Sequence, residues 1–378
     1  MYVFLNTQNL VEVFKAYCSK KYLDERYGMK NEVNFFGITN SGQEVKRYTL
    51  TNDFGYSVSI LNYGGIICGI NIPDKEGVVE NIVLGHTTIK NYEENSPYFG
   101  CITGRTAGRI NNAEFKIDET IYKLNKNNGN HNLHGGLKGF DKVIWSAKEL
   151  IERDCIGLSL NYVSKHLEEG YPGNLDMTVI YKWNNENELT IRYLANTDME
   201  TPITLTNHTY FNLSGDLSTT ILDHELHIAA DQFVKISANL IPFDISNVEG
   251  TPFDFRLAKA VGQDIDLEDE QIKNGKGYDH PFVLNGSNKP QITLVHKDSG
   301  RKLSVLTNEK CLVCYTGNFL TTEMKAYDHI SIQPRSGICL ETQYYPDSLN
   351  FELVPSKTLK PSETYDQTTM YKFSVLKI

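Results

Sequence analysis

The sequence contains no apolar run that approaches the roughly 18 residues needed for a membrane-spanning helix. It is also poor in positive charge, with 37 Lys and Arg against 47 Asp and Glu and a formal net charge of −10. Nucleic acids and anionic membrane surfaces are bound by clustered Lys and Arg. We therefore expect neither a nucleic acid nor a membrane as a partner.

The N-terminus lacks the features of a secretory signal. It begins Met-Tyr-Val-Phe-Leu-Asn-Thr-Gln, without a basic segment, a long apolar segment or a small-residue cleavage site. Cysteine occurs seven times, and an odd number scattered through a long chain does not indicate a disulfide framework. We expect a cytoplasmic protein whose cysteines are mostly buried free thiols.

Residues 1–33 differ in pattern from the rest of the chain. Four apolar residues lie there at i, i+3, i+4 and i+7, which are Leu10, Val13, Phe14 and Tyr17. This spacing is typical of one face of a helix. We predict a short N-terminal helical extension in residues 1–33, of open purpose, and a main domain in residues 34–378.

The main domain alternates apolar and polar residues with period two and has frequent turn signals. Its clearest predicted strands are Leu158–Val163, Leu175–Trp183 and Leu189–Leu194. No sustained helical period separates the strands, so βαβ units are not indicated. No Gly-x-Gly-x-x-Gly follows a strand and no P-loop is present, so no nucleotide cofactor is expected. The pattern predicts one large all-β domain with antiparallel sheets.

Two glycine-rich polar segments are the first candidates for a site. Gly104–Asn112 contains Arg109, whose planar guanidinium suits paired oxygen acceptors, although an exposed or ion-paired arginine is the common alternative. Asn125–Trp145 reads as a long ordered loop containing His131 and His134. No Cys or acidic residue stands at ligand spacing from these histidines, so we do not predict a metal site.

The segment Thr204–Gly215 has two different faces if it forms a strand. Its polar face consists of Thr204, Thr206, His208, Tyr210 and Asn212. Such a row of hydrogen-bonding groups suits a polyhydroxylated ligand. A solvent-exposed sheet face is the alternative, but such a face usually carries Lys and Glu, and this one has neither.

Two acidic residues adjoin apolar strands. Asp279 stands just before one, where a turn or cap residue and a binding residue are equally good interpretations. Glu341 ends the apolar run Ile338–Leu340, so partial burial there is expected to raise its pKa. An ordinary strand-end charge is the alternative for Glu341.

In this order the segments resemble the aldose 1-epimerase family, also called galactose mutarotases, from about Phe36 to the C-terminus. The matching motifs are Gly104–Ile110, Leu133–Gly136 with Gly139–Lys142 and Trp145, Thr206–His208 with Tyr210–Leu213, Asp279, Tyr315–Asn318, and Leu340–Gln343 with Pro346–Asp347. The resemblance implies a galactose mutarotase-like β-supersandwich, a sugar pocket on its concave face and no cofactor.

The resemblance also implies roles for individual residues. Glu341 matches the general base of the family and His208 its general acid. The residues that match sugar-binding positions are Arg109, His134 and Asp279, to which we add Tyr210 from the polar row. Two positions depart from the family pattern, because Gly108 replaces a common Asn and Val313 a frequent Gln. Each departure removes a hydrogen-bonding side chain.

The activity implied is interconversion of the α and β anomers of D-galactose or D-glucose by acid–base ring opening and closure. His208 would need its proton near neutral pH, and we expect Asp279 or Glu341 to raise its pKa from about 6.5. Two alternatives stay open. One is a hexose-6-phosphate 1-epimerase, for which only Arg105 and Lys142 offer extra positive charge. The other is a carbohydrate-binding or sensor protein without catalysis. The preferred aldose and the oligomeric state are not predicted.

Overall fold

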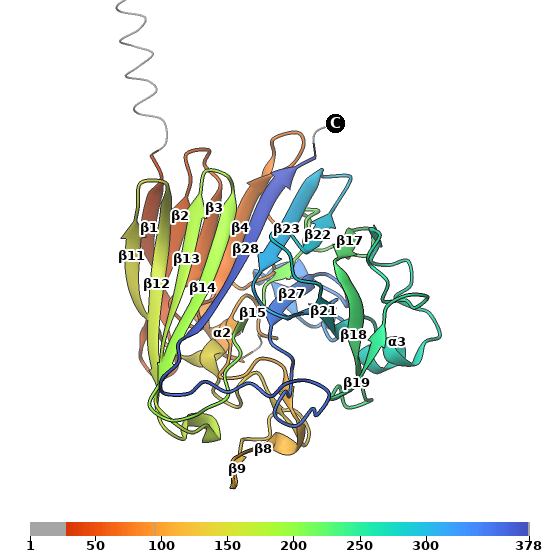
Figure 1. The fold of residues 1–378 in the computed structure, drawn as a ribbon. Coiled ribbons are helices and arrows are strands. Elements are labelled where there is room, and N and C mark those ends of the chain that lie inside the picture. Colours follow the sequence, from red (N-terminus) through yellow and green to blue (C-terminus); the bar gives the residue numbers. More distant parts are fainter. Residues whose placement is uncertain (1–27, 95, 377–378) are drawn as a thin grey trace, which may run out of the picture.

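The computed structural model describes residues 28–94 and 96–376, and these form a β-sandwich with few helices (Figure 1). The larger sheet has nine strands in the order β11-β12-β13-β14-β28-β23-β22-β17-β20. Their bounds are Ser146–Ile151, Cys155–Ser164, Leu175–Asn184, Glu188–Thr197, Tyr365–Val375, Arg301–Thr307, Ile292–Val295, Glu225–Ile228 and Lys259–Ala260.

The opposite layer consists of two smaller sheets. One has the order β1-β2-β3-β4-β5, with bounds Lys30–Ile38, Glu44–Thr51, Ser57–Leu61, Ile67–Pro73 and Val79–Asn81. The other has the order β16-β27-β24-β21-β18-β19, with bounds Tyr210–Phe211, Ile338–Gln343, Cys311–Tyr315, Asp279–Leu284, Ala230–Ile236 and Pro242–Asn247. An isolated bridge between Val83 and Phe211 joins them.

Shorter elements connect the layers. The strand pairs are β7 with β10 (Arg109–Ile110, Asn132–Leu133), β6 with β15 (Ile102–Thr103, Thr206–Asn207), β8 with β9 (Glu114–Ile117, Thr120–Lys123) and β25 with β26 (Lys325–Ala326, Ile330–Ser331). The helices are α2 (Ile89–Glu94), α3 (Glu270–Gly275) and the 3₁₀ turns Asn111–Ala113, Phe140–Lys142 and Glu168–Gly170. Neither α-helix of the described residues has the length and apolar character of a membrane span.

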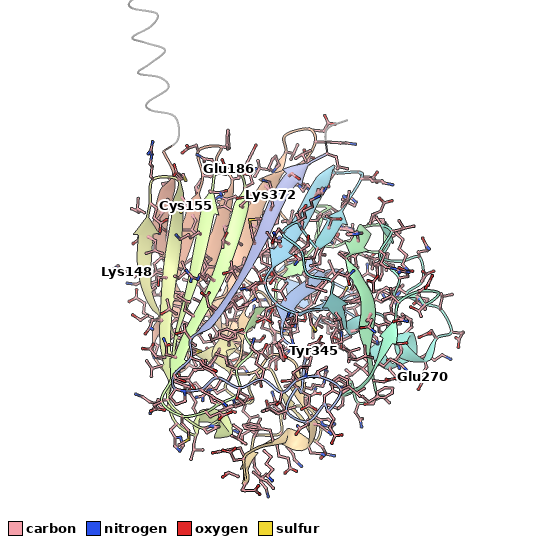
Figure 2. The ribbon with its side chains drawn as sticks, in the orientation of Figure 1. Lys148, Cys155, Glu186, Glu270, Tyr345 and Lys372 are labelled. Carbon is pink, nitrogen blue, oxygen red and sulfur yellow. The ribbon has the colours of Figure 1, made fainter. Side chains whose placement is uncertain are left out.

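One continuous apolar core lies between the layers. It combines side chains such as Leu158 and Ile191 from the nine-stranded sheet, Ile60 from the five-stranded sheet, and Leu312 and Leu340 from the six-stranded sheet. Figure 2 shows the extent of this sandwich, with Lys148 on β11 at one side of the molecule and Glu270 of α3 at the other. Burial of one face of every large sheet explains the alternating pattern of the sequence.

The all-β prediction is confirmed, and its three clearest strands are β12, β13 and β14, each longer than predicted. The five cysteines Cys68, Cys101, Cys311, Cys314 and Cys339 are buried free thiols as expected, whereas Cys155 is partly exposed.

Residues 1–27 of the predicted N-terminal extension lie outside the described residues. Strand β1 begins at Lys30 and pairs with β2, so residues 30–33, which we assigned to the extension, belong to the sheet.

Candidate active site

The outer face of the six-stranded sheet forms the floor of the candidate site. Along β27, Ile338 and Leu340 point into the core, while Cys339, Glu341 and Gln343 alternate with them and face the other way. Hydrogen-bond register sets two cross-strand rows on that face. Glu341 pairs with Val313, which pairs with Pro281, and Cys339 pairs with Tyr315, which pairs with Asp279.

Register also brings His208 and Glu341 together from distant parts of the chain. Strand β16 pairs with β27 through Tyr210 and Cys339. Because the pairing is antiparallel, His208, two residues before Tyr210, comes opposite Glu341, two residues after Cys339. Nε2 of His208 lies 3.6 Å from Oε1 of Glu341. The other ring nitrogen, Nδ1, lies 3.5 Å from Sγ of Cys339. The imidazole is therefore held from both sides by β27.

A second pairing places Arg109 and His134 at the same site. Strand β7 pairs with β10 so that Arg109 is opposite Leu133, the neighbour of His134. Nδ1 of His134 accepts a hydrogen bond from the Gly108 amide at 3.2 Å, and Nε of Arg109 donates to Oδ1 of Asn128 at 3.0 Å. The His134 ring lies edge-on to the His208 ring with 5.2 Å between centroids.

The glycine after His134 is required by this packing. Gly135 has φ +94°, and a Cβ on it would lie 1.8 Å from the carbonyl oxygen of Gly104. No other residue fits this close approach of two backbones. The Gly-rich loop predicted from the sequence therefore brings the 104–110 and 133–136 segments into direct contact.

These groups surround one cavity of about 620 Å³, within the size range of small-molecule sites. All six residues predicted for the site line it, namely Arg109, His134, His208, Tyr210, Asp279 and Glu341. A further part of the wall is apolar and includes Ile236, Leu240, Pro281, Val313 and Phe319. The cavity thus has a polar end of convergent hydrogen-bonding groups and an apolar side.

Burial dominates the electrostatics of the polar end. It raises the pKa of Glu341 well above its usual range, and the nearby Asp279 carboxylate raises this pKa further while Arg109 opposes both. Burial also raises the pKa of Asp279. The same loss of water lowers the pKa of His208 to about 4 and holds the pKa of His134 well below its usual range.

The expected rise in the pKa of His208 is therefore wrong. Glu341 does lie beside the ring, but the cost of burying a charged imidazolium outweighs its attraction. Burial therefore favours the neutral form of both groups.

The predicted polar row does not form a single binding face. The segment is interrupted between β15 and β16, and of the row only His208 and Tyr210 line the cavity. Nδ2 of Asn212 donates instead to the carbonyls of Thr219 and Ser336. The Tyr210 hydroxyl donates to the Pro97 carbonyl at 2.9 Å, so this residue contributes its ring to the wall.

Tyr98 is a wall residue that sequence reasoning missed. Its ring lies 4.7 Å from the His134 ring and 5.8 Å from the His208 ring, measured between centroids. The residue has φ +67°, and its carbonyl accepts hydrogen bonds from the amide and the thiol of Cys101. A left-handed tyrosine in a loop has no periodic signal by which the sequence would reveal it.

The two basic residues considered for a phosphate do not line the cavity. Arg105 is fully buried and donates to the carbonyls of Pro172 and Gly173 and to Oγ of Ser164. Lys142 donates to the Leu137 carbonyl. Arg109 is the one Lys or Arg among the lining residues of the described chain.

The cluster of His134, His208 and Glu341 has donor atoms close enough for a metal ion. However, the hydrogen bond from Gly108 occupies the Nδ1 lone pair of His134, so the neutral ring carries its proton on Nε2. A metal ion would have to displace that proton or that bond. The hydrogen bonding of His134 suits a hydroxyl ligand better than a cation.

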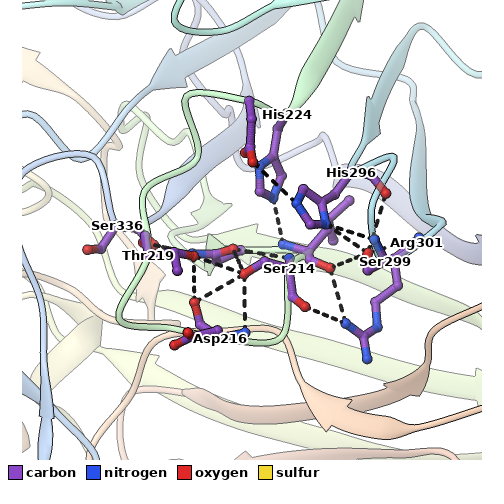
Figure 3. A network of polar contacts seen from close by, with 11 residues as sticks. Ser214, Asp216, Thr219, His224, His296, Ser299, Arg301 and Ser336 are labelled. Carbon is purple, nitrogen blue, oxygen red and sulfur yellow. Dashed lines mark hydrogen bonds and ion pairs between the residues drawn. The ribbon is translucent and has the colours of Figure 1, made fainter.

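A second cluster, Asp223, His224 and His296, lies outside the cavity in the polar network of Figure 3. Nε2 of His224 accepts from the Leu213 amide, and Nδ1 of His296 accepts from the Ser299 amide. The remaining nitrogens of both rings face Asp223 at 2.9 and 3.4 Å, and they carry the protons. His224 thus donates to Asp223, and the N–H of His296 faces the same carboxylate, so the lone pairs of both rings are already used and are not available to a metal.

Comparison with known proteins identifies the family. Residues 46–372 match the family model described as "Aldose 1-epimerase". The chain belongs to the aldose 1-epimerase family. Galactose mutarotase of Bos taurus is 40% identical over 334 residues, which cover 88% of this chain and 94% of that relative. Aldose 1-epimerase of Escherichia coli K12 is 34% identical over 344 residues, covering 89% and 97% respectively.

A solved structure of the aldose 1-epimerase family extends the likeness to three dimensions. Galactose 1-epimerase of Lactobacillus acidophilus superposes with a TM-score of 0.82 and 30% identity, covering 93% of this chain and all of that one. The galactose mutarotase-like sandwich predicted from the sequence motifs is therefore confirmed.

Proposed function

We propose that the protein is an aldose 1-epimerase that interconverts the α and β anomers of a free aldose such as D-galactose or D-glucose. The observation that carries this proposal is the 3.6 Å approach of a buried carboxyl and a buried imidazole in one cavity. Family membership and relatives named galactose mutarotase support it.

Ring opening needs one base and one acid. The Glu341 carboxylate takes the proton of the C1 hydroxyl, the bond between C1 and the ring oxygen breaks, and that oxygen takes a proton from Nε2 of His208. The open aldehyde rotates about the C1–C2 bond, and ring closure reverses both transfers on either face of C1. Positioned proton transfer of this kind contributes about 10²–10⁴-fold to a rate.

The pair carries one proton before and after ring opening. Before it, Glu341 is ionised and His208 is protonated; after it, Glu341 is protonated and His208 is neutral. The net charge of the buried pair is zero in both states, so the reaction requires no change in buried charge. Burial favours the second state, in which both groups are neutral, and Arg109 favours the ionised carboxylate.

The remaining polar groups hold the sugar. Arg109, His134 and Asp279 line the same end of the cavity and offer donors and acceptors to hydroxyls and to the ring oxygen. Holding the substrate between fixed groups adds an entropic advantage. The tyrosine rings of Tyr98 and Tyr210 beside His208 exclude water from the acid.

The alternatives have weaker support. A hexose 6-phosphate substrate would need positive charge for its phosphate, and Arg105 is committed to backbone carbonyls while Lys142 does not line the cavity. A binding protein without catalysis would not need the paired Glu341 and His208. Residence in the cytoplasm stays a prediction from the N-terminal sequence.

Polarimetry on freshly dissolved α-D-galactose tests the proposal. The protein should accelerate the decay of optical rotation above the spontaneous rate, and Glu341→Gln should abolish the acceleration. Glucose and glucose 6-phosphate are compared in parallel. Faster mutarotation of glucose 6-phosphate than of the free sugars would replace the proposal with the phosphate alternative. If the protein accelerates mutarotation of none of these sugars, the binding protein without catalysis is the remaining alternative.

A further inference from the structure

The imidazole of His208 has a thiol as the partner of its second nitrogen. Nδ1 of His208 lies 3.5 Å from Sγ of Cys339, while Nε2 faces Glu341. Cys339 is fully buried and stands two residues before Glu341 on β27. Within residues 28–94 and 96–376, no other side chain forms a hydrogen bond with Nδ1. Histidines that transfer protons more often bind a carboxylate or a backbone carbonyl through the second nitrogen.

The thiol of Cys339 is neutral. Burial raises its pKa well above the usual range, and the nearby Glu341 carboxyl raises it further. The contact therefore joins an uncharged S–H group to the ring, and no thiolate is present to attract a proton. A thiol is a weak donor and a weak acceptor, so the sulfur alone does not decide which partner donates.

The opposite end of the ring decides the direction of this contact. Burial favours the protonated carboxyl of Glu341, whose Oε1 lies 3.6 Å from Nε2 of His208. A neutral imidazole has one N–H and one lone pair. With the hydrogen on Nδ1, the ring offers its lone pair to the carboxyl, which is a much better donor than a thiol. The sulfur of Cys339 is then the acceptor.

The main chain favours the same tautomer. The carbonyl oxygen of His208 accepts from its own ring and so raises its pKa, and Nδ1 is the ring nitrogen nearer to the main chain. This oxygen also accepts the Gly100 amide at 3.0 Å, so it is shared between two donors. Cys339 is therefore the partner of Nδ1 that a substitution removes.

The other groups around the ring do not fix its hydrogens. Besides Cys339 and Glu341, the titratable groups that face it are the rings of Tyr98, His134, Tyr210 and Tyr315 and, in the same cavity, Arg109 and Asp279. Burial keeps the three tyrosines and His134 uncharged, because it raises the pKa of each phenol and lowers that of the imidazole.

We propose that Cys339 is a positioning residue for the acid: its sulfur accepts the Nδ1–H of His208, which leaves Nε2 as the nitrogen that gains and loses the proton. This inference rests on the proposed function for the role of His208. The Nδ1–H bond stays in place when Nε2 gives its proton to the ring oxygen and when Nε2 takes it back. Cys339 does not line the cavity, so it acts through His208 and not on the sugar.

A sulfur suits this task because it orients the ring without adding charge. A carboxylate beside Nδ1 would stabilise the imidazolium and make it a weaker acid. A neutral, weak acceptor holds the ring and leaves the protonated form ready to release its proton.

The direct test is nitrogen NMR of the protein with labelled histidine rings, in which the His208 signals are those lost in His208→Asn. In the wild type at neutral pH, Nδ1 should be the protonated nitrogen and Nε2 the unprotonated one. Cys339→Ala removes the acceptor and should move the tautomer ratio about twofold to tenfold toward Nε2–H, as expected for one hydrogen bond. Cys339→Ser has nearly the volume of the alanine variant but keeps an acceptor, so it should keep the wild-type tautomer.

Kinetics on D-galactose give a second measurement. Cys339→Ala should lower kcat about twofold to tenfold and leave KM within about twofold, because it disturbs the acid and not the binding of the sugar. Cys339→Ser should keep kcat within about twofold of the wild type. Equal losses in both variants with an unchanged tautomer would show a packing role and overturn the inference.

Cys314→Ala is the matched control. Cys314 is also fully buried and lies on the adjacent strand β24, but it pairs with Leu340 and belongs to the apolar core. This variant should keep the wild-type tautomer of His208 and the wild-type kcat. Thermal unfolding of all variants checks that they are folded.

The outcomes separate the two proposals. An Nε2–H tautomer in the wild type would overturn the role of Cys339 even where mutarotation is observed, and this measurement decides also if Cys339→Ala does not fold. An unchanged tautomer in folded Cys339→Ala would overturn it as well. An Nδ1–H tautomer that depends on Cys339, in a protein that does not accelerate mutarotation, would support the hydrogen bond and overturn the proposed function alone.

Discussion

Oε1 of Glu341 lies 3.6 Å from Nε2 of His208 although 132 residues separate them in the sequence. Antiparallel pairing of β16 with β27 produces this approach, and the thiol of Cys339 holds the far side of the ring. The two groups share one proton in a cavity where neither single charge is favoured by burial.

Glu341→Gln should remove most activity without unfolding the protein. The amide has the shape of the carboxyl group but cannot accept the C1 proton, so kcat should fall by about 10²–10⁴-fold. Polarimetric rates at saturating D-galactose measure the loss, and circular dichroism checks the fold. A variant with a near wild-type rate would dismiss Glu341 as the base.

His208→Asn should lower kcat far more than Asp279→Ala does. In the proposed mechanism His208 delivers the proton to the ring oxygen, whereas Asp279, which lies in the neighbouring cross-strand row of the same cavity, holds hydroxyls. Asp279→Ala should act mainly through KM, because its contact is made in the ground state and the transition state alike. Steady-state kinetics of both variants checks the ranking, and the reverse order would exchange the assigned roles.

The acid limb of the pH profile should lie near pH 4 rather than near 6.5. Burial lowers the pKa of His208 to about 4 while it raises that of Glu341, so the pair takes up a second proton only below about pH 4. Below that pH a second proton blocks the base, and activity falls. The dependence of kcat/KM on pH from about 3 to about 8, corrected for spontaneous mutarotation, gives the midpoint of this limb. A midpoint near 6.5 would show a solvent-exposed imidazole instead.

Arg105→Met should destabilise the fold without acting on the site directly. The buried guanidinium donates to the carbonyls of Pro172 and Gly173 and to Ser164, and its loss leaves these acceptors unpaired. The free energy of unfolding should fall by about 3 kcal/mol, as for several charge-assisted hydrogen bonds. Urea denaturation measures it. Arg192→Met, which breaks an exposed ion pair with Asp366, is the control and should have a much smaller effect.

Several parts of the molecule were predictable from local pattern. Strands β12, β13 and β14 alternate because one face of each is buried, and this alternation is visible without any tertiary information. The motifs likewise indicated six site residues, and all six line one cavity. The continuous strand predicted through His208 was wrong, because β15 and β16 pair with different partners, β6 and β27.

The all-β architecture and the family could be predicted from the chain alone, because alternation and motif order are properties of the sequence, and all six residues predicted for the site line one cavity. The lowered pKa of His208 and the hydrogen bond from the Tyr210 hydroxyl to Pro97 could not be predicted in this way. These depend on which groups surround a side chain after folding. Desolvation and hydrogen-bond satisfaction are set by neighbours from distant segments, and no local pattern specifies those neighbours.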